Sequence, residues 1–198
     1  MSQIALIGGR ATLADQIITR RLATDVALVA AGAGLTALAA QIAVPLWPVP
    51  ITGQTLAVLL VGSSLGMVRG ALSMVLYALL GIIGLPVFSD ASSGLGVVAG
   101  PTGGYIIGFI LSAALVGWIA QRSWDRRFVG AALAFAAGTV ITFITGLIWL
   151  SASLSLDLEA TLAAGLYPFI IGGIVKALIA AAAIPLAWRG VDKLARRK

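Results

Sequence analysis

The sequence predicts an all-α integral membrane protein, a bundle of six transmembrane helices with both termini in the cytoplasm and structured outer loops. Of its 198 residues, 60% are hydrophobic and only 10% are charged, whereas soluble domains carry about a quarter charged residues. The mean hydropathy is +1.08. Apolar segments close to the roughly 20 residues that a membrane-spanning helix needs recur along the chain. The placement of the basic residues then fixes the orientation of the bundle.

The first 25 residues form the predicted cytoplasmic leader. They carry Arg10, Arg20 and Arg21 between short apolar runs. A secretory signal would show a basic start, an apolar middle and a small-residue cleavage site in that order, and this segment does not. We expect an interfacial helix here, with Leu13, Ile17 and Leu22 along the membrane surface.

Residues 26–188 form the predicted six-helix membrane domain. Four apolar segments are long enough to span the bilayer, namely 26–46, 105–120, 129–150 and 162–188. A further apolar stretch, 51–86, is interrupted by Gly-Met-Val-Arg-Gly at 66–70. A charge flanked by glycines is typical of a turn, so this stretch is divided into two rather short spans.

The basic residues set the orientation of the six spans. Twelve of the thirteen Lys and Arg residues fall on one side of this model: Arg10, Arg20, Arg21, Arg69, Arg122, Arg126, Arg127, Arg189, Lys193, Arg196, Arg197 and Lys198. The opposite loops carry Asp90, Asp157 and Glu159 and no basic residue. Because basic loops stay in the cytoplasm, the sequence predicts a multi-pass membrane protein with this basic side in the cytoplasm. The basic tail, 189–198, is expected to contact anionic lipid or a neighbouring protein and not nucleic acid.

Small residues recur along one face of the first span, at Ala30, Ala33, Gly34, Ala37 and Ala40. Such faces let two helices approach closely in lipid. The face serves either for packing within the chain or for docking of a partner membrane protein, and the sequence leaves both open.

The segment from residue 84 to 108 joins two strongly apolar regions. It combines many glycines and two prolines with Phe88, Asp90 and Tyr105. Glycine permits close backbone approach and proline fixes local direction, so the composition favours a shaped loop that closes over a small molecule. A flexible linker between two spans is the alternative.

Lys176 is the one basic residue outside the cytoplasmic set. It lies deep in the last span, where an ionisable group is costly and is by default a candidate for function. Phe169, Gly172, Gly173 and Ala180 lie at helical spacing from it, and the two glycines leave room for a ligand. Snorkelling or internal pairing of the lysine is the alternative.

The connection between the first two spans holds Pro45, Pro48 and Pro50, which enforce an extended outer loop. Thr52, Gln54 and Thr55 then place hydrogen-bonding groups at the outer mouth of the second span. Gln54 is either an amide contact to a ligand or a helix cap.

Catalysis and metal binding find little support. The chain has no cysteine and no histidine, no acidic cluster, and no Gly-Lys-Ser/Thr or dinucleotide fingerprint. Neither a resident metal nor a cofactor is expected, and the protein is not expected to be an enzyme. Transport driven by ATP would require another chain to supply the ATPase.

Four motifs together resemble the BioY family, the biotin-specific membrane subunits (S components) of energy-coupling factor (ECF) transporters. They are Pro-Val-Pro-Ile-Thr-Gly-Gln-Thr-Leu-Ala-Val-Leu-Leu at 48–60, Arg-Gly-Ala-Leu at 69–72, Leu-Tyr-Ala-Leu-Leu-Gly-Ile-Ile-Gly-Leu-Pro-Val-Phe at 76–88, and Gly-Pro-Thr-Gly-Gly-Tyr at 100–105. The resemblance implies a six-helix bundle that binds biotin from outside with high affinity. It also implies a transmembrane coupling subunit, docked on an Ala-x-x-x-Ala face of the first helix that Ala33 and Ala37 match, and two cytoplasmic ATPases.

One departure from the family pattern concerns the last span. The family motif is similar to Gly-Asp-Leu-Ile-Lys, in which both charged residues contact the ligand, and this chain reads Gly172-Gly173-Ile174-Val175-Lys176. The lysine carries over and the aspartate does not. Since the ureido N–H groups of biotin need an acceptor, we expect Asp90 to replace the missing carboxylate. The full set of expected ligand contacts is Thr52, Gln54, Phe88, Asp90, Gly103, Tyr105 and Lys176.

The sequence thus predicts biotin binding and uptake as the substrate-binding subunit of an ATP-driven vitamin transporter. An S component for another small vitamin is an alternative that Gly173 keeps open. An autonomous secondary transporter is a second alternative, although charged relay residues and inverted halves are not evident.

Overall fold

The structure, a computed structural model, describes residues 11–195. Its helices are α1 (Leu13–Ile17), α2 (Leu22–Ala40), α3 (Gln54–Leu65), α4 (Met67–Ile82), α5 (Leu95–Ala99), α6 (Gly103–Ala120), α7 (Phe128–Leu154), α8 (Leu158–Gly165) and α9 (Ile170–Ala195). Short 3-10 turns, η2 (Ser89–Ala91), η3 (Trp124–Arg126) and η4 (Tyr167–Phe169), and the strands β1 (Ala43–Val44) and β2 (Ile51–Thr52) complete the described chain.

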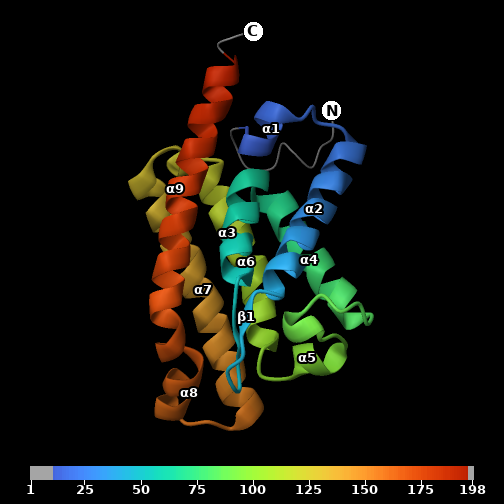
Figure 1. Cartoon of the computed structure of the whole chain (residues 1–198), viewed down its shortest axis with the longest axis vertical. Helices are drawn as coiled ribbons and strands as arrows, with labels where there is room; N and C mark the ends of the chain where they lie inside the picture. The colour runs from blue at the N-terminus through green and yellow to red at the C-terminus, as the bar shows by residue number, and fades with distance from the viewer. Residues whose placement is uncertain (1–10, 196–198) are drawn as a thin grey trace.

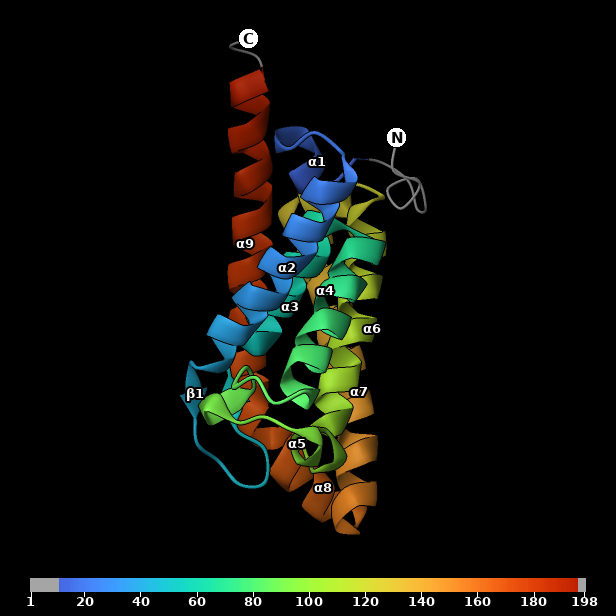
Figure 2. The same ribbon diagram turned by 90° about the vertical axis from the view of Figure 1, so that its right-hand side faces the viewer.

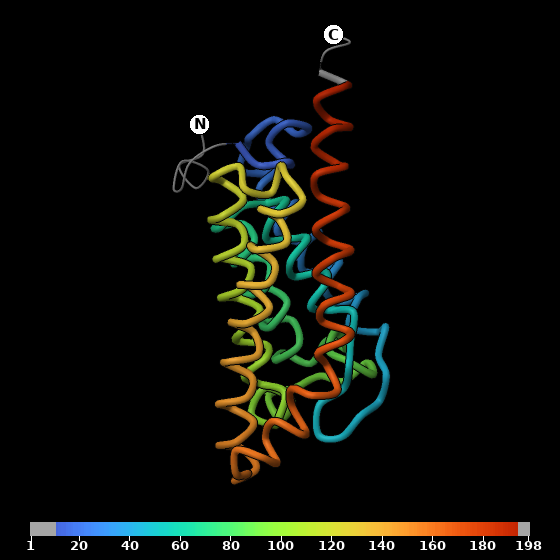
Figure 3. The backbone as a smooth tube through the Cα atoms, turned by 90° about the vertical axis from the view of Figure 1, so that its left-hand side faces the viewer, coloured from blue at the N-terminus to red at the C-terminus, as the bar shows by residue number. Residues whose placement is uncertain are grey.

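The long helices run side by side along the long axis of the molecule (Figure 1). α3 lies inside the bundle, where it packs against α2, α4, α6 and α9. α1 and the C-terminal part of α9 lie at one end, as two views at right angles agree (Figures 1 and 2). The β1–β2 hairpin, α5 and α8 lie toward the opposite end (Figures 1 and 3). This second end is where the candidate site lies.

Each predicted apolar segment contains a helix, but not all of the helix limits match the prediction. Four segments are long and apolar enough to cross a membrane, Leu22–Ala40, Gly103–Ala120, Phe128–Leu154 and Leu158–Lys193, and α3 and α4 are shorter apolar helices. The first span ends at Ala40 and not at residue 46, because the chain turns there into β1. The last span is also corrected, since α8 and η4 break the expected helix before Ile170.

The turn between α3 and α4 lies at Gly66, as the charge between glycines predicted. Gly66 has a φ of 85° and is followed at once by Met67, the first residue of α4. A Cβ atom at Gly66 would also lie 2.8 Å from the Thr12 side chain. Only glycine combines this backbone conformation with such close packing at low cost.

Arg69 ties three segments together at the end of the bundle that holds α1. Its guanidinium contacts Asp15 on α1 at 2.7 Å and Asp25 on α2 at 3.3 Å, and it donates to the Thr12 hydroxyl at 3.0 Å. Burial raises the pKa of Asp15, but hydrogen bonds from Arg20, Thr12 and Arg69 outweigh this effect and lower its pKa to about 2. The leader helix is therefore held against the bundle by ionised groups.

This packing corrects the expected interfacial leader. Leu13 is buried in a cluster that includes Leu59 of α3 and Trp188 of α9, whereas Ile17 and Leu22 are exposed. Of the three apolar residues expected along the membrane surface, two are thus exposed and Leu13 is part of the core. Arg10, with Arg196, Arg197 and Lys198 of the predicted basic tail, lies outside the described residues.

Asp125 provides a second polar link at the same end. It is 1% exposed, and its Oδ2 atom accepts hydrogen bonds from the Trp188 indole at 2.8 Å and the Ser63 hydroxyl at 3.2 Å. Burial raises the pKa of this carboxyl, although the two hydrogen bonds and the charge of Arg126 oppose the change. The residue connects α3, η3 and α9 through one side chain.

Candidate functional site

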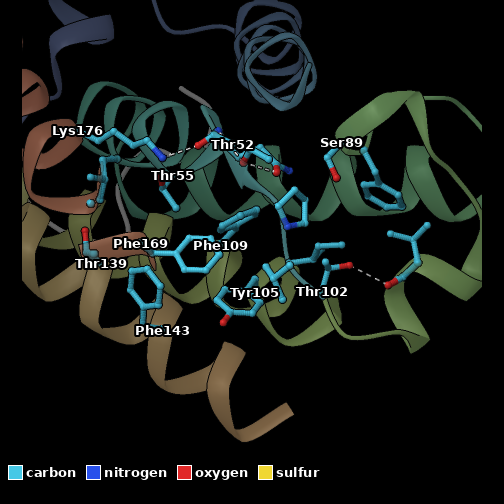
Figure 4. Close-up of a pocket in the computed structure, with 18 residues that line it drawn as sticks. Thr52, Thr55, Ser89, Thr102, Tyr105, Phe109, Thr139, Phe143, Phe169 and Lys176 are labelled. Atoms are coloured by element: carbon cyan, nitrogen blue, oxygen red, sulfur yellow. Dashed lines mark hydrogen bonds between the residues drawn. The ribbon is translucent and has the colours of Figure 1, made fainter. Parts of the chain in front are cut away.

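A cavity lies between α3, α6, α7 and α9 and is bordered by the β1–β2 hairpin and the segment around η2. Its lining includes Val49, Pro50, Thr52, Gln54, Thr55, Leu59, Phe88, Ser89, Val97, Thr102, Tyr105, Ile106, Phe109, Thr139, Phe143, Phe169, Gly173 and Lys176. Figure 4 shows these side chains around one space. The segments that the sequence singled out, 45–55, 84–108 and the surroundings of Lys176, therefore meet at one site.

Lys176 supplies the charge of this cavity. Among the described residues that line it, Lys176 is the only Lys, Arg, Asp or Glu. Its Nζ atom donates a hydrogen bond to the backbone carbonyl of Thr52 at 2.6 Å. An ammonium carries three N–H donors, and the described residues give it one hydrogen-bond partner. The arrangement suits a ligand with an anionic or strongly accepting group.

Polar side chains at the start of α3 form a short chain of hydrogen bonds. The Thr52 hydroxyl donates to the Gln54 Oε1 atom at 2.7 Å, and the Gln54 amide nitrogen donates to the Tyr77 hydroxyl. Gln54 is buried and Tyr77 is fully buried. Both ends of the Gln54 amide thus have protein partners, so Gln54 fixes the shape of the wall in addition to lining the cavity.

Aromatic rings make up most of the apolar wall. Phe143 lies edge-on to Tyr105, with 6.1 Å between ring centroids, and to Phe169 at 5.9 Å. The Tyr105 hydroxyl donates to the carbonyl of Gly165 at 2.8 Å, which ties α6 to the end of α8. Tyr105 therefore offers the cavity its ring and not its hydroxyl, and the rings in Figure 4 form a surface for a flat or aliphatic body.

Phe88 closes the cavity on the side of α4. It is 1% exposed and contacts Tyr77 edge-to-face, with 5.4 Å between ring centroids. Its ring occupies the space where a Cβ atom at Gly81 would lie. Gln41, at the end of α2, holds the following turn by donating to the Phe88 carbonyl at 3.1 Å and accepting from the Ala91 N–H at 3.1 Å.

Two predicted contacts, Asp90 and Gly103, do not line this cavity. Asp90 is exposed and has a φ of 56°, a left-handed conformation that turns its carboxylate into a separate outer groove with Pro45 and Pro101. Gly103 is buried where a Cβ atom would collide with the Val98 carbonyl and the Trp149 indole. Asp90 is thus not brought to Lys176, and Gly103 serves close packing of α6.

The expected docking pair on α2 also requires correction. Ala33 is 1% exposed because it packs inside the core of the same chain, and Ala37 is partly buried against that core. The opposite side of α2 is the exposed one, and its members include Ala23, Ala27, Ala30, Ala31 and Gly34. Ala27 and Ala31 reproduce the same spacing of small residues on this exposed side.

Several lining residues were not among the predicted contacts. Thr139 and Phe143 lie one turn apart on α7, and Ile106 and Phe109 lie on one face of α6. In a sequence that is apolar on nearly every helix face, these residues have no distinguishing signal. The sequence identified Thr55 only as a hydrogen-bonding residue near the start of the second span. The fold places it on the same side of the cavity as Lys176 (Figure 4). Groups of His, Cys, Asp and Glu able to hold a metal ion do not occur within residues 11–195.

The comparisons with known proteins agree with the motifs. The model of the BioY family matches residues 10–193. The chain is 34% identical over 152 residues to "Biotin transporter BioY2" of Lactococcus lactis, covering 77% of this chain and 83% of that protein. It is 36% identical over 147 residues to "Biotin transporter BioY" of Thermotoga maritima, covering 74% and 85%.

A solved structure shares the fold. The crystal structure of an S-component for biotin from an ECF-type ABC transporter matches with a TM-score of 0.75 at 25% identity, covering 86% of this chain and 95% of that one. The match to the family model spans nearly all of the described residues. The helical bundle is similar to that of the solved S-component. The chain therefore belongs to the BioY family.

Proposed function

We propose that this protein binds biotin and takes part in its uptake as the S component of an ECF transporter. The observation that carries the proposal is the cavity with one ammonium, from Lys176, set against the aromatic wall of Tyr105, Phe109, Phe143 and Phe169. Biotin has an apolar bicyclic body and side chain with a carboxylate and a ureido carbonyl at its two ends, and both of these groups accept hydrogen bonds from an ammonium. Relatives named as biotin transporters support the same ligand.

The proposed ligand contacts are those predicted residues that line the cavity, namely Thr52, Gln54, Phe88, Tyr105 and Lys176. Lys176 supplies donors, and Phe88 and Tyr105 supply apolar surface. Thr52 orients two of these residues. Its backbone carbonyl accepts from Lys176, and its hydroxyl donates to Gln54. No step in this role requires catalysis, a metal or a resident cofactor.

The proposed topology has six spans, formed by α2, α3, α4, α6, α7 and α9, in the bacterial inner membrane. α3 and α4 are short, and their tight junction at Gly66 keeps them in the bundle. Arg69 lies in the first turn of α4, and Arg122 and Arg127 lie in the connection between α6 and α7. Both places are at the end of the bundle that holds α1, because Arg69 contacts Asp15 of α1 and η3 of this connection packs against α9. By the positive-inside rule this end is cytoplasmic, and the cavity lies toward the opposite, outer end of the bundle.

The proposed partners are a transmembrane coupling subunit and two cytoplasmic ATPases. The exposed side of α2, with Ala23, Ala27 and Ala31, is the proposed docking face. Small side chains there allow the backbone of another helix to approach closely within lipid. This face replaces the Ala33 and Ala37 pair, which the core of the chain covers.

Ligand binding by the purified protein is the direct test. We expect biotin to bind in detergent or nanodiscs and to raise the unfolding temperature, with a rise that grows with the logarithm of the biotin concentration above its Kd. Growth of a biotin-requiring strain should depend on co-expression of the coupling subunit and ATPases. Uptake by the lone chain in proteoliposomes would instead support a secondary transporter. Binding of a different vitamin with no response to biotin would reject the proposed ligand.

A further inference from the structure

Thr55 carries a polar group in the cavity that has no partner. Its Oγ1 atom is buried and makes no hydrogen bond with any described residue. A buried hydroxyl without a partner loses its hydrogen bonds to water and gains none in return, which is unfavourable for folding. Such a group in a cavity wall indicates a partner that arrives from outside the chain.

The other helical threonines show why this one differs. Thr36, Thr142 and Thr145 each donate to the carbonyl four residues earlier in their own helix. Thr55 lies in the first turn of α3, and the residue four positions before it is Ile51 in β2. The carbonyl of Ile51 is therefore not part of the helix, and the Thr55 hydroxyl lacks the intrahelical acceptor that the other threonines use. The hydroxyl stays available to the cavity that Thr55 lines.

The neighbourhood of Thr55 defines what it can bind. Thr52, whose carbonyl holds the Lys176 ammonium at 2.6 Å, lies three residues before it. Figure 4 shows Thr55 and Lys176 on the same side of the cavity. Lys176 can only donate hydrogen bonds, so it selects an acceptor such as a carbonyl. In a cyclic urea that carbonyl is flanked by N–H donors, and these require an acceptor nearby.

Among the described residues, the side-chain acceptors that line the cavity are all neutral. No carboxylate lines it among the described residues, and the Oε1 atom of Gln54 already accepts from Thr52. We propose that Thr55 is a specificity-determining residue whose hydroxyl oxygen accepts a ureido N–H of the ligand beside the carbonyl held by Lys176. This inference rests on the proposed biotin function and adds the acceptor that Gly173 does not supply.

The test compares Thr55→Val, which keeps the shape and removes the hydroxyl, with Thr55→Ser, which keeps the hydroxyl. Ser112→Ala is the matched control, because Ser112 also has a buried hydroxyl without a partner but does not line the cavity. We expect biotin affinity to fall at least tenfold in Thr55→Val and to stay within about threefold of wild type in the other two variants. The unliganded Thr55→Val protein should unfold at the wild-type temperature or higher, because it loses an unsatisfied hydroxyl. A clear drop in that temperature would mean that the hydroxyl has a partner within the fold and would overturn the inference.

Two biotin analogues identify the group that Thr55 contacts. The affinity ratio between wild type and Thr55→Val should persist with biotinamide, whose side chain is neutral, and should disappear with a ureido N-methylated biotin. A ratio that disappears with biotinamide and persists with the N-methylated analogue would place Thr55 at the carboxylate and reject the inference. Unchanged biotin affinity in Thr55→Val would also reject it while leaving the biotin function intact. Wild-type protein that does not bind biotin would instead reject the proposed function itself.

Discussion

The ammonium of Lys176 lies 2.6 Å from the backbone carbonyl of Thr52, although the two residues are 124 positions apart in the chain. This hydrogen bond joins α9 to the end of the β1–β2 hairpin and so links the last helix to the first outer loop. A buried ammonium requires hydrogen-bond acceptors to offset its lost hydration. The Thr52 carbonyl supplies one, and the remaining N–H groups are oriented by it.

Replacement of Lys176 by Met should therefore weaken biotin binding while keeping the fold. Met preserves much of the aliphatic stem and removes the charge, so the loss should be about 2–3 kcal/mol, as for a hydrogen bond to a charged group. Isothermal titration of the purified variant measures it. Lys193→Met, which removes an exposed charge from the same helix far from the cavity, is the control. Affinity close to wild type in a folded Lys176→Met protein would contradict the assignment.

The exposed side of α2 gives the second prediction. Ala27→Trp and Ala31→Trp should abolish co-purification with the coupling subunit but leave biotin affinity unchanged, because both residues are exposed and distant from the cavity lining. Ala33→Trp should instead reduce folded yield, since Ala33 is 1% exposed and overpacking a core typically costs about 1–3 kcal/mol or more.

Val140→Trp, on an exposed part of α7, controls for a bulky residue in the lipid-facing surface. The measurement is the amount of coupling subunit recovered with each tagged variant. Full recovery with both α2 variants would show that the docking face lies on another helix.

The sequence predicted where the helices lie better than it predicted which side of each helix faces the core of the protein. Length and apolarity located α2, α6 and α7, and the charge at Arg69 located the break between α3 and α4. In a membrane protein, however, both the core and the lipid-facing surface are apolar. The periodic signal that separates inside from outside in a soluble helix is then weak, which is why Ala33 could not be distinguished from Ala31.

In the candidate site as well, the sequence identified some of the lining residues but not how distant segments are arranged around them. Lys176 was predicted because a charge at that depth is rare, and Phe88 and Tyr105 because they lie in a shaped loop. Asp90 was expected beside Lys176 but does not line that cavity. Its exposed position depends on a left-handed turn held by Gln41, a contact over 50 positions in sequence. Contacts of this kind arise from the packing of whole helices, and a local pattern does not contain them.

The ion pairs around Arg69 give a prediction about pH and stability. Because the pKa of Asp15 falls from 3.8 to about 2 in the folded protein, the ionised carboxylate stabilises the fold above about pH 4. That contribution, about 2 kcal/mol, should be lost as the pH falls from 4 to 2. Intrinsic fluorescence of the five tryptophans follows unfolding across this range.

Asp15→Asn should lower stability by about 3 kcal/mol at pH 7, because it leaves the buried Arg69 guanidinium with one carboxylate fewer. Its stability should also change less than that of wild type between pH 4 and 2. Glu159→Gln, at an exposed position, should change neither quantity. An Asp15→Asn protein as stable as wild type would show that α1 is held by apolar packing of Leu13 alone.

The last prediction concerns the carboxylate that relatives carry three residues before the lysine. Asp90 is exposed and borders an outer groove, and the cavity of Lys176 does not include it. We therefore expect Asp90→Ala to bind biotin within about twofold of wild type. A large loss would mean that the outer loop moves to bring Asp90 to the ligand. The measurement is a biotin titration of each variant under one set of conditions.

Gly173 is where a new carboxylate should act. A Cβ atom there would lie 3.9 Å from both Phe143 and Thr139, which is ordinary contact distance, so a side chain fits without displacing the wall. One helical turn separates it from Lys176, and a carboxylate there would accept from a ureido N–H in a charged hydrogen bond. We expect Gly173→Asp to tighten biotin binding by about 1 kcal/mol or more. Gly173→Asn, of equal size and without charge, should give a smaller gain. If Asp binds no better than Asn at this position, the negative charge is not what the ligand requires, and acceptance of the N–H group falls to neutral oxygens such as that of Thr55.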